Sequence, residues 1–324
     1  MLYCGFDIGG TKCAVSIGTY EKGEELNILS RIQFKTKDIP SPYAVIDEMI
    51  RLMGEACEQA KVEVKDVAAI GVSCGGPLDS KRGVILSPPN LIGWDNIEIV
   101  DYVQKKTGIK CALQNDANAC ALAEGLFGAG KGTRNMIFFT FGTGLGAGLI
   151  LDGKLYSGTN DNAGEAGHMR LGDYGPVGYG KNGSFEGFCS GNGIAQIGRT
   201  YAMELLQQGK TCAYAKSMAD LDSVTAKTVG DAAEAGDETA IRVYAESGRR
   251  LGQGLSVIVD LFNPELIVIG GVFMRSRDLL YPYADQVMRN ECLPLAYNVC
   301  KVVPAKLSEN IGDYAALAIS ASSM

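Results

Sequence analysis

The chain has 324 residues, 46% of them hydrophobic, which is enough to bury the cores of two domains of ordinary size. A formal net charge of −7 and a sequence pI near 5.0 argue against a nucleic acid partner, because binding to a phosphate backbone needs a basic surface. No apolar run approaches the ~20 residues of a membrane span, and the first residues lack the pattern of a secretory signal. We therefore expect a cytoplasmic protein without a membrane partner.

Ten cysteines and 42 glycines stand out in the composition. The cysteines form no Cys-x-x-Cys pair and most lie inside apolar runs, which favours buried free thiols in a reducing compartment over disulfides or a metal site. The glycines follow no repeat period and cluster in bends between apolar runs, which excludes collagen-like and disordered chains.

The N-terminal segment predicts a strand, a bend and a second strand. An apolar run over residues 2–8 is followed by the bend Gly9-Gly10-Thr11-Lys12, and residues 13–17 resume the strand. Glycines allow several backbone N–H groups to turn outward together, so this bend could hold phosphate oxygens. Asp7 lies at the end of the first strand, where its carboxylate could orient a Mg²⁺ ion through water or simply cap the turn.

The next stretch predicts a helix, a buried strand and two loops. Residues 43–60 carry apolar side chains at helical spacing after a Ser-Pro start, and residues 67–72 form a buried-strand run. The strand leads into a loop that contains Gly76, where a ligand could approach the backbone. A second loop contains Asn90 and the only tryptophan, Trp94, which packing in a core would explain.

A carboxylate follows the next predicted strand. We expect a helix over residues 97–107 and a strand over 111–113, and then Asn115 and Asp116 precede a helix over 119–127. Ligands of α/β proteins bind at the carboxyl ends of strands, so Asp116 is a candidate for chemistry. The alternative is a helix cap, because Asp and Asn are preferred capping residues.

A second glycine bend lies near the middle of the chain. An apolar run over residues 136–141 breaks at Gly142-Thr143-Gly144 and resumes at residue 149, which predicts a β-hairpin. Two such bends could hold a polyphosphate between them, although each could also be an ordinary tight turn. Glu165 and His168, the only histidine, follow between glycines.

The C-terminal half alternates helices and strands. A long irregular loop ends in a third acid, Glu186. A buried strand over residues 265–269 runs into Gly270-Gly271, where adenine could stack on bare backbone or where the glycines could serve packing alone. Helices are expected over residues 191–207, 227–234, 238–262, 279–289 and 311–320, with a strand over 300–303. This alternation predicts an α/β protein with mixed sheets.

The order and spacing of these motifs resemble the ROK family (repressors, open reading frames and kinases) of sugar kinases, in the actin, Hsp70 and hexokinase superfamily. The resemblance covers nearly the whole chain and implies a two-lobed actin-like ATPase (ribonuclease H-like) fold, with nucleotide and sugar in the interdomain cleft. The expected smaller domain comprises residues 1–118 and about 304–324, and the larger one residues 119–303. The motifs that carry the resemblance are Asp7 with Gly9 to Lys12, Asn115-Asp116, Gly142 to Gly144, Glu165 with His168, and Gly270-Gly271.

The resemblance also implies roles for single residues. Asp116 matches the catalytic base, and the implied cofactors are ATP and Mg²⁺, with Asp7 holding Mg²⁺ through water. The residues implied in substrate binding are Gly76, Asn90, Asn115, Asp116, Glu165, His168 and Glu186. Those implied in nucleotide binding are Asp7, Gly9, Gly10, Thr11, Lys12, Gly142, Thr143, Gly144, Gly270 and Gly271.

One loop departs from the family pattern. The family commonly carries three cysteines here, which together with the histidine hold a structural zinc. In this chain those positions are Val177, Tyr179 and Ser184, so we expect no zinc. Packing is expected to replace the metal through Tyr174, Pro176 and Phe185.

The resemblance implies an ATP-dependent hexose kinase that phosphorylates a 6-hydroxyl, with glucose as the first candidate and allose, mannose, fructose, N-acetylmannosamine or a β-glucoside as alternatives. A non-catalytic sugar-binding sensor and an actin-like or chaperone-type ATPase without a sugar stay open as other classes. The family's repressors carry a helix-turn-helix domain before the first glycine motif, which here begins at residue 7, so we expect no DNA reader. A homodimer is suggested only by the family.

Overall fold

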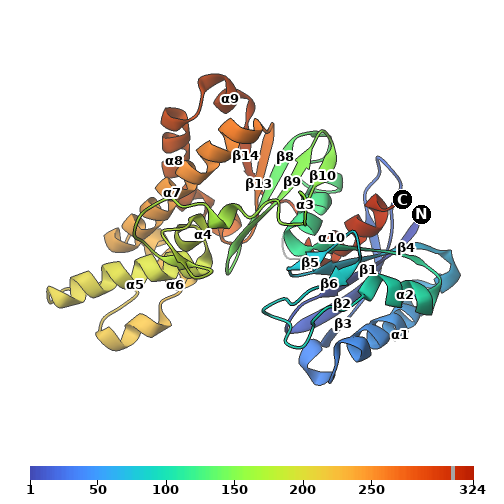
Figure 1. Cartoon of the computed structure of the whole chain (residues 1–324). Helices are drawn as coiled ribbons and strands as arrows, with labels where there is room; N and C mark the ends of the chain where they lie inside the picture. Colours follow the sequence, from blue (N-terminus) through green and yellow to red (C-terminus); the bar gives the residue numbers. More distant parts are fainter. Residues whose placement is uncertain (308–310) are drawn as a thin grey trace. The chain divides into compact units, whose positions relative to one another are not determined.

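The computed structural model describes residues 1–307 and 311–324, which form two compact units from interleaved stretches of the chain (Figure 1). The first unit contains residues 1–134, 148–163 and 306–324, and the second contains residues 135–147 and 164–305. The domain boundary expected at residue 119 differs from this division, because α3 (Asp116–Leu126) packs against α10 (Ile311–Ser322) within the first unit. The expected segment 304–324 includes residues 308–310, which lie outside the described residues.

The first unit is built on a five-stranded sheet with the order β3-β2-β1-β4-β7. The pairs β1–β2 and β2–β3 are antiparallel, whereas β1–β4 and β4–β7 are parallel. The strands are β1 (Leu2–Ile8), β2 (Lys12–Thr19), β3 (Asn27–Lys35), β4 (Val67–Cys74) and β7 (Lys110–Asn115), with a small pair β5 (Leu78–Asp79) and β6 (Val84–Ile85). The other helices are η1 (Thr36–Asp38), α1 (Pro42–Ala60), η2 (Val64–Asp66) and α2 (Ile99–Thr107).

The alternation of side chains along β1 decides where its polar residue points. Cys4, Phe6 and Ile8 lie in the hydrophobic core cluster that also contains apolar residues of α1. Successive side chains of a strand point to opposite faces, so Gly5 and Asp7 share the other face. That face is covered by α10 at such short range that a Cβ on Gly5 would lie 2.8 Å from the Cβ of Ala316. Asp7 is therefore directed toward the start of α10.

The second unit contains the parallel pairs of β13 (Leu266–Ile269) with β8 (Met136–Phe141) and with β14 (Lys301–Pro304). The sheet to which these strands belong has the order β10-β9-β8-β13-β14, and the division between the units falls within β9 (Leu145–Leu151), which pairs with β10 (Lys154–Tyr156). The helices are η3 (Ala166–His168), α4 (Phe185–Phe188), α5 (Gly191–Gln207), η4 (Met218–Ser223), α6 (Ala226–Glu234), α7 (Glu238–Phe262), α8 (Val272–Glu291) and α9 (Pro294–Val299), with a small pair β11 (Val177–Gly178) and β12 (Lys181–Asn182).

The prediction of an α/β chain with mixed sheets is confirmed, and several elements differ from the expectation. Strand β3 and helix α9 have no counterpart in the sequence analysis; α9 leaves Leu295 85% exposed and so lacks an apolar face to detect. Helix α8 begins at Val272 instead of at residue 279. Ser276 has non-helical backbone angles (φ −114°, ψ 22°) inside this helix, which interrupts the helical spacing of its apolar residues.

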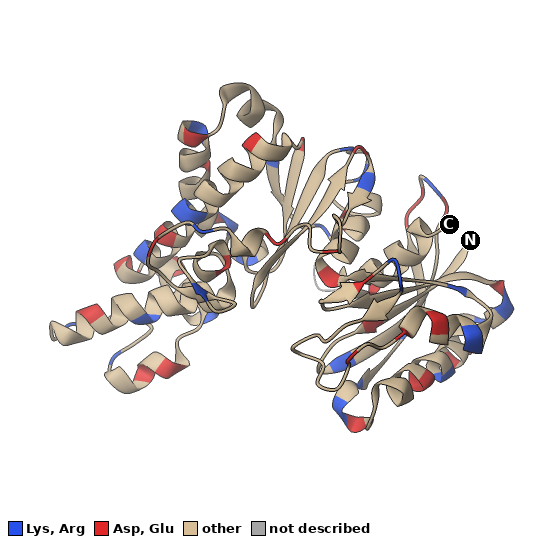
Figure 2. Ribbon diagram, in the orientation of Figure 1, with Lys and Arg blue, Asp and Glu red and all other residues tan. Residues whose placement is uncertain are grey.

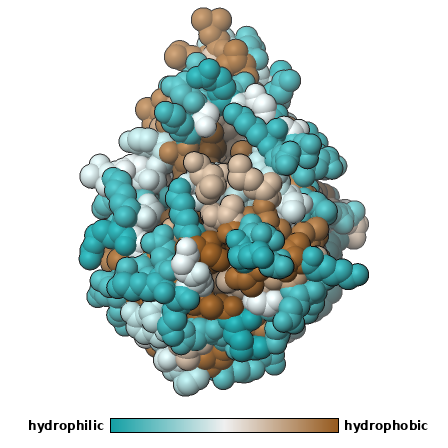
Figure 3. Space-filling model, turned by 90° about the vertical axis from the view of Figure 1, so that its right-hand side faces the viewer, coloured by the Kyte–Doolittle hydropathy of each residue, from teal (hydrophilic) through white to brown (hydrophobic). Residues whose placement is uncertain are grey.

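Charged residues of both signs are spread over the chain, and most of its cysteines are buried. Basic and acidic residues lie scattered among uncharged ones on the helices in Figure 2, and Figure 3 shows hydrophobic residues interspersed with hydrophilic ones on one face. All ten cysteines are free and only Cys300 is not fully buried, so the prediction of buried thiols is confirmed. No helix within residues 1–307 and 311–324 has both the length and the apolar character needed to cross a membrane.

Candidate functional site

The glycine bend after β1 lies beside the loop that carries Asn90. The N–H of Gly9 donates to the carbonyl of Lys12 at 3.1 Å, which closes the bend, and the hydroxyl of Thr36 donates to the carbonyl of Gly9 at 2.6 Å. A Cβ on Gly10 would lie 2.2 Å from the carbonyl oxygen of Asn90, so only glycine allows this approach. The structure thus brings together two sequence-predicted regions of the first unit, and it leaves Thr11 and Lys12 exposed.

Asp116 occupies the first position of α3, directly after β7. The helix cap is Asn115, whose Oδ1 accepts from the N–H of Asn118 at 2.8 Å. The capping alternative for Asp116 is therefore wrong, and its carboxylate Oδ1 accepts from the N–H of Ala117 at 2.8 Å. Gly76 lies close to this junction, because a Cβ built on it would be 4.0 Å from Nδ2 of Asn115.

The ends of three parallel strands meet at this place. Ile8 of β1 pairs with Cys74 of β4, and Cys74 pairs with Asn115 of β7. Asp7 and Asp116 consequently stand at the same edge of one sheet, where α/β proteins bind ligands. The register of the sheet, which we did not predict from the sequence, brings them to the same edge.

The pKa values of two carboxylates at this edge are raised, and neighbouring acids contribute in the case of Asp7. The pKa of Asp7 is raised to about 6 from 3.8, first by burial and then by the charges of Asp313 and Asp116, while Arg31 lowers it. Asp116 is exposed to solvent, yet desolvation by the surrounding protein raises the pKa of its carboxyl as well, against backbone hydrogen bonds that lower it. Asp313 was not identified from the sequence; it is buried on α10 and accepts from Ser16 at 2.9 Å and from Arg31 at 2.6 Å.

The second glycine bend, in the second unit, is held by the start of α5. The N–H of Gly142 donates to the carbonyl of Gly144 at 3.0 Å, and the N–H of Gly191 donates to the carbonyl of Gly142 at 2.7 Å. Thr143 remains exposed at the tip. Helix α5 is 17 residues long and Ser190 caps it, so its positive end is directed toward this bend.

Gly271 joins the same region from the start of α8. Its φ of +66° lies in the left-handed region that favours glycine, and a Cβ on it would lie 2.1 Å from the carbonyl oxygen of Phe141. Gly270 lies beside the ring of Phe138, because a Cβ built on it would be 3.3 Å from Cζ of that ring. Because Gly271 touches the end of β8, the predicted phosphate bend and the predicted diglycine site are adjacent.

A hollow of about 370 Å³ in the second unit is lined by Gly142, Thr143 and Gly271. The size falls in the range of small-molecule sites. Most of the polar residues that line this hollow were not identified from the sequence. The available signal was their position near the predicted starts of helices. These residues are Asn192, Arg199, Thr225, Lys227 and Arg275.

Glu186 lies between the bend and the turn that carries Glu165 and His168. Its Oε2 accepts from the N–H of Leu145 at 2.9 Å, and its Cβ would be 3.3 Å from a Cβ on Gly167. The side chains of Glu165 and His168 are exposed at either end of η3. Glu186 also lines a second hollow, of about 230 Å³, together with Thr143.

The loop expected to pack without zinc is held by only part of the expected set. Phe185 is fully buried and lies against Gly254 of α7, whereas Tyr174 is 87% exposed and does not replace a metal by packing. The carbonyl of Pro176 instead accepts from the N–H of Gly183 at 3.0 Å. The ring of Tyr179 meets that of His168 edge to face at 5.4 Å. Within the described ranges, no group of three or more His, Cys, Asp or Glu side chains could hold a metal ion.

Comparison with known proteins places these features in a family. The model of the ROK family matches residues 3–322. The glucokinase of Streptomyces coelicolor is 32% identical over 280 residues, which cover 86% of this chain and 84% of that protein. The DNA-binding transcriptional dual regulator NagC of Escherichia coli is 28% identical over 82% of this chain and 64% of its own length. The structure of a ROK family glucokinase from Streptomyces griseus, in complex with glucose and AMPPNP, is 29% identical with a TM-score of 0.73 and covers 99% of this chain and 100% of that one.

Proposed function

Since the chain belongs to the ROK family and has the actin-like ATPase fold of its sugar kinases, we propose that it is an ATP-dependent hexose kinase that phosphorylates a 6-hydroxyl. Relatives named glucokinase make glucose the first candidate. The observation that carries the proposal is the carboxylate of Asp116, which stands at a strand end, has a raised pKa and leaves helix capping to Asn115. This is the environment that a general base needs.

In the proposed reaction, Asp116 accepts the proton of the 6-hydroxyl while the hydroxyl oxygen attacks the γ-phosphorus of ATP. The bond between that phosphorus and the bridging oxygen breaks, and ADP leaves. A carboxylate with a raised pKa is a stronger base than one in water, so the raised pKa of Asp116 supports the transfer of the proton. Most of the remaining acceleration comes from holding the reactants in line and neutralising charge.

The surroundings of Asp7 fit a Mg²⁺ ion. Its carboxylate stands beside the charges of Asp313 and Asp116, and its raised pKa reflects the cost of keeping it ionised there. A divalent cation would offset this accumulation of negative charge, and Mg²⁺ commonly needs only one or two carboxylates because water and phosphate supply its other ligands. When bound, the ion neutralises charge on the phosphates. Asp7 would hold it through water.

We assign the remaining candidate residues to the sugar or to the nucleotide by the polar side chains or the open backbone that they present. Hydroxyl groups of the sugar would be bound by Gly76, Asn90, Asn115, Glu165, His168 and Glu186. The nucleotide would be bound by the bend from Gly9 to Lys12, by Gly142 to Gly144, and by Gly270 and Gly271. The hollow of about 370 Å³ beside the starts of α5 and α8 is lined by Gly142, Thr143 and Gly271, and this supports their assignment to the nucleotide.

The proposal is tested by measuring ADP release with ATP and Mg²⁺ over a panel of sugars: glucose, allose, mannose, fructose, N-acetylmannosamine and a β-glucoside. We expect one hexose to be turned over far faster than the others. Hydrolysis of ATP that does not depend on any sugar would support an ATPase of the actin or chaperone type. Mass spectrometry of the product would show whether the phosphate is on the 6-hydroxyl.

A sugar-binding sensor is the second candidate, because NagC, a transcriptional regulator, is among the relatives. Such a protein would bind a sugar from the same panel but release no ADP with any of them. The two functions are separated by combining the ADP assay with calorimetric titration of each sugar.

A further inference from the structure

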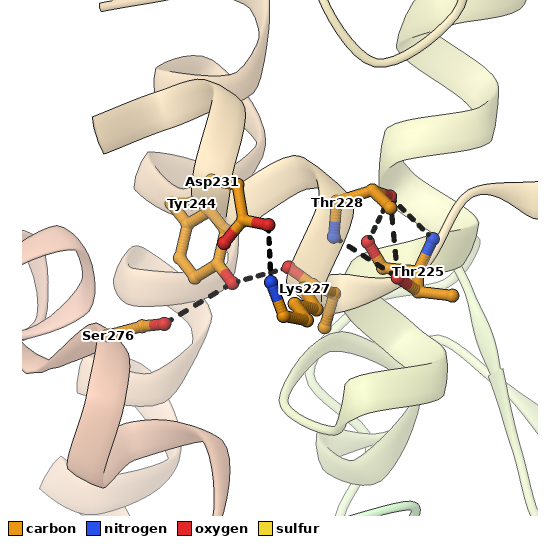
Figure 4. A network of polar contacts seen from close by, with 7 residues as sticks. Thr225, Lys227, Thr228, Asp231, Tyr244 and Ser276 are labelled. Atoms are coloured by element: carbon orange, nitrogen blue, oxygen red, sulfur yellow. Dashed lines mark hydrogen bonds and ion pairs between the residues drawn. The ribbon is translucent and has the colours of Figure 1, made fainter. Parts of the chain in front are cut away.

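Tyr244 on α7 is a fully buried phenol that is hydrogen-bonded to two other helices. It is 1% exposed, and its hydroxyl donates to the carbonyl of Ala226 on α6 at 2.9 Å. The same hydroxyl accepts from the hydroxyl of Ser276 on α8 at 3.4 Å, as Figure 4 shows. A single side chain thus connects α6 and α8 (Figure 4).

The two helices that Tyr244 connects form walls of the hollow of about 370 Å³. The first turn of α6 contributes Ala226 and Lys227, and the first turn of α8 contributes Val272 and Arg275. Ser276 has non-helical backbone angles, so the first turn of α8 is set apart from the rest of the helix at the residue that bonds to Tyr244. The position of this turn therefore depends on contacts such as this one.

The first turn of α6 is held together by its own hydrogen bonds, so a shift of one of its residues is expected to shift the whole turn. Thr225 and Thr228 form a reciprocal capping box, in which the N–H of Thr228 donates to Thr225 at 3.1 Å and the N–H of Thr225 donates to Thr228 at 3.0 Å. Lys227 pairs with Asp231 of the same helix at 2.5 Å (Figure 4), and both side chains are exposed. Neither contact fixes the turn relative to α8.

The phenol has little room to move. A Cβ on Gly230, one turn along α6, would lie 2.9 Å from the hydroxyl oxygen of Tyr244, so the side chain fills its site up to the backbone of α6. Burial also raises the pKa of Tyr244, which keeps the hydroxyl protonated and able to donate.

We propose that Tyr244 is a positioning residue for the nucleotide, which fixes the spacing of the α6 and α8 walls and thereby sets the affinity for ATP. The inference rests on the proposed function, because it takes the hollow as the nucleotide site. Tyr244 does not line the hollow, so its effect passes through Ala226 and Ser276. The affinity for the sugar and the rate of the chemical step are independent of it.

The test compares the wild-type chain with Tyr244→Phe, which keeps the ring and removes both hydrogen bonds. Calorimetry with AMPPNP and steady-state kinetics with ATP should show the nucleotide Kd and the KM for ATP rising about three- to ten-fold. The kcat and the KM for the preferred sugar should change by less than about two-fold, a split that general destabilisation would not produce. Unchanged AMPPNP affinity in this variant would overturn the inference.

Ser276→Ala, alone and combined with Tyr244→Phe, separates a positioning effect from a loss of stability. Ser276→Ala removes only the bond to α8 and should weaken AMPPNP by about two- to three-fold, with no additional loss when combined with Tyr244→Phe. If Tyr244→Phe does not fold, Ser276→Ala still tests the inference. An affinity for AMPPNP equal to that of the wild type in Ser276→Ala would then overturn the inference.

The matched control is Tyr297→Phe. The hydroxyl of Tyr297 donates to Asp285 on α8 at 2.7 Å, so this variant loses a comparable bond to the same helix outside the hollow. It should bind AMPPNP as the wild type does, and an equal loss in both variants would contradict a specific role for Tyr244. A wild-type chain that binds no AMPPNP would overturn the proposed function itself, and this is seen before any variant is compared.

Discussion

The strand ends of the first unit and the hollow of the second unit have opposite electrostatic characters. At the strand ends, Asp7 and Asp116 are carboxylates whose pKa values are raised by burial, in the case of Asp7 also by neighbouring acids. Around the hollow, the starts of α5 and α8 present backbone N–H groups and the positive ends of two helices. The first region can accept a proton or a cation, whereas the second can hold an anion.

The two regions also differ in whether side chains or backbone groups produce their electrostatic character. At the strand ends it depends on ionised side chains, so an isosteric change from acid to amide should remove it. Around the hollow it depends on close backbone approach, as at Gly271, where a Cβ would lie 2.1 Å from the carbonyl oxygen of Phe141. Adding a methyl group should therefore be more damaging there than changing a charge.

The largest effect is expected for Asp116→Asn, which tests the side-chain region. Loss of a general base lowers the rate by ~10²- to 10⁴-fold, so kcat should fall by about this factor while the sugar Kd stays within about three-fold. ADP release and calorimetric titration of the sugar measure the two quantities. The matched control is Asp101→Asn, an exposed acid on α2 that pairs with Lys105. Turnover by Asp116→Asn at the wild-type rate would show that the base lies elsewhere.

Gly271→Ala tests the backbone region and should have the next largest effect. The new Cβ meets the carbonyl of Phe141 and φ is +66°, so the free energy of unfolding should fall by roughly 2–4 kcal/mol, with loss of AMPPNP binding. Gly142→Ala is the control for stability, because a Cβ there meets nothing within 4 Å. Urea unfolding measures both variants. Equal stability of the two would show that the close approach at Gly271 does not matter.

Asp7→Asn should change stability in a pH-dependent way. The folded chain retains the proton of Asp7 up to a pKa of about 6, above the ordinary 3.8, so wild-type stability falls as pH rises between these values and stays low above them. The amide cannot ionise. Without nucleotide or Mg²⁺, the variant should exceed the wild type at pH 8 by on the order of 1–3 kcal/mol, less at pH 5, and not at all near pH 4. Urea unfolding at the three pH values measures this, and a pH-independent difference would refute the assignment.

The smallest effect is expected from a chelator. Three of the four positions where the family holds zinc are Val177, Tyr179 and Ser184, so incubation with EDTA should shift the Tm by no more than about 1 °C. Metal analysis of the purified chain should find zinc far below one equivalent. A full equivalent of zinc, together with a large drop in Tm on its removal, would contradict this expectation.

Much of the fold followed from local patterns in the sequence. Helices α5 and α7 begin and end at the expected residues, because long amphipathic segments with polar caps are strong signals. The start of α8 was missed because Ser276 breaks its periodicity. Tyr174 was expected to pack and is exposed, since an irregular loop contains no periodicity that distinguishes its inner from its outer side.

The candidate site was only partly accessible to the same reasoning. The glycine bends and the Asn115-Asp116 pair were identified because their residue types are unusual at those places. Asp313, Arg275 and Lys227 were not, because nothing in their immediate sequence distinguishes them from other charged residues on helices. They belong to the site only because the tertiary packing places the ends of their helices beside the bends.

By itself, the sequence determined the α/β class and the positions of the glycine bends, because turn chemistry and hydrophobic periodicity act over a few residues. The role of Asp116 as the candidate base was implied by the resemblance of its motifs to those of a known family. Only the tertiary structure decided that Asn115 rather than Asp116 is the cap, that Asp313 raises the pKa of Asp7, and that Tyr244 connects α6 to α8. Two of these relations join residues far apart in the chain. They depend on strand register and helix packing. Many residues of the core determine these together, so a single motif does not reveal them.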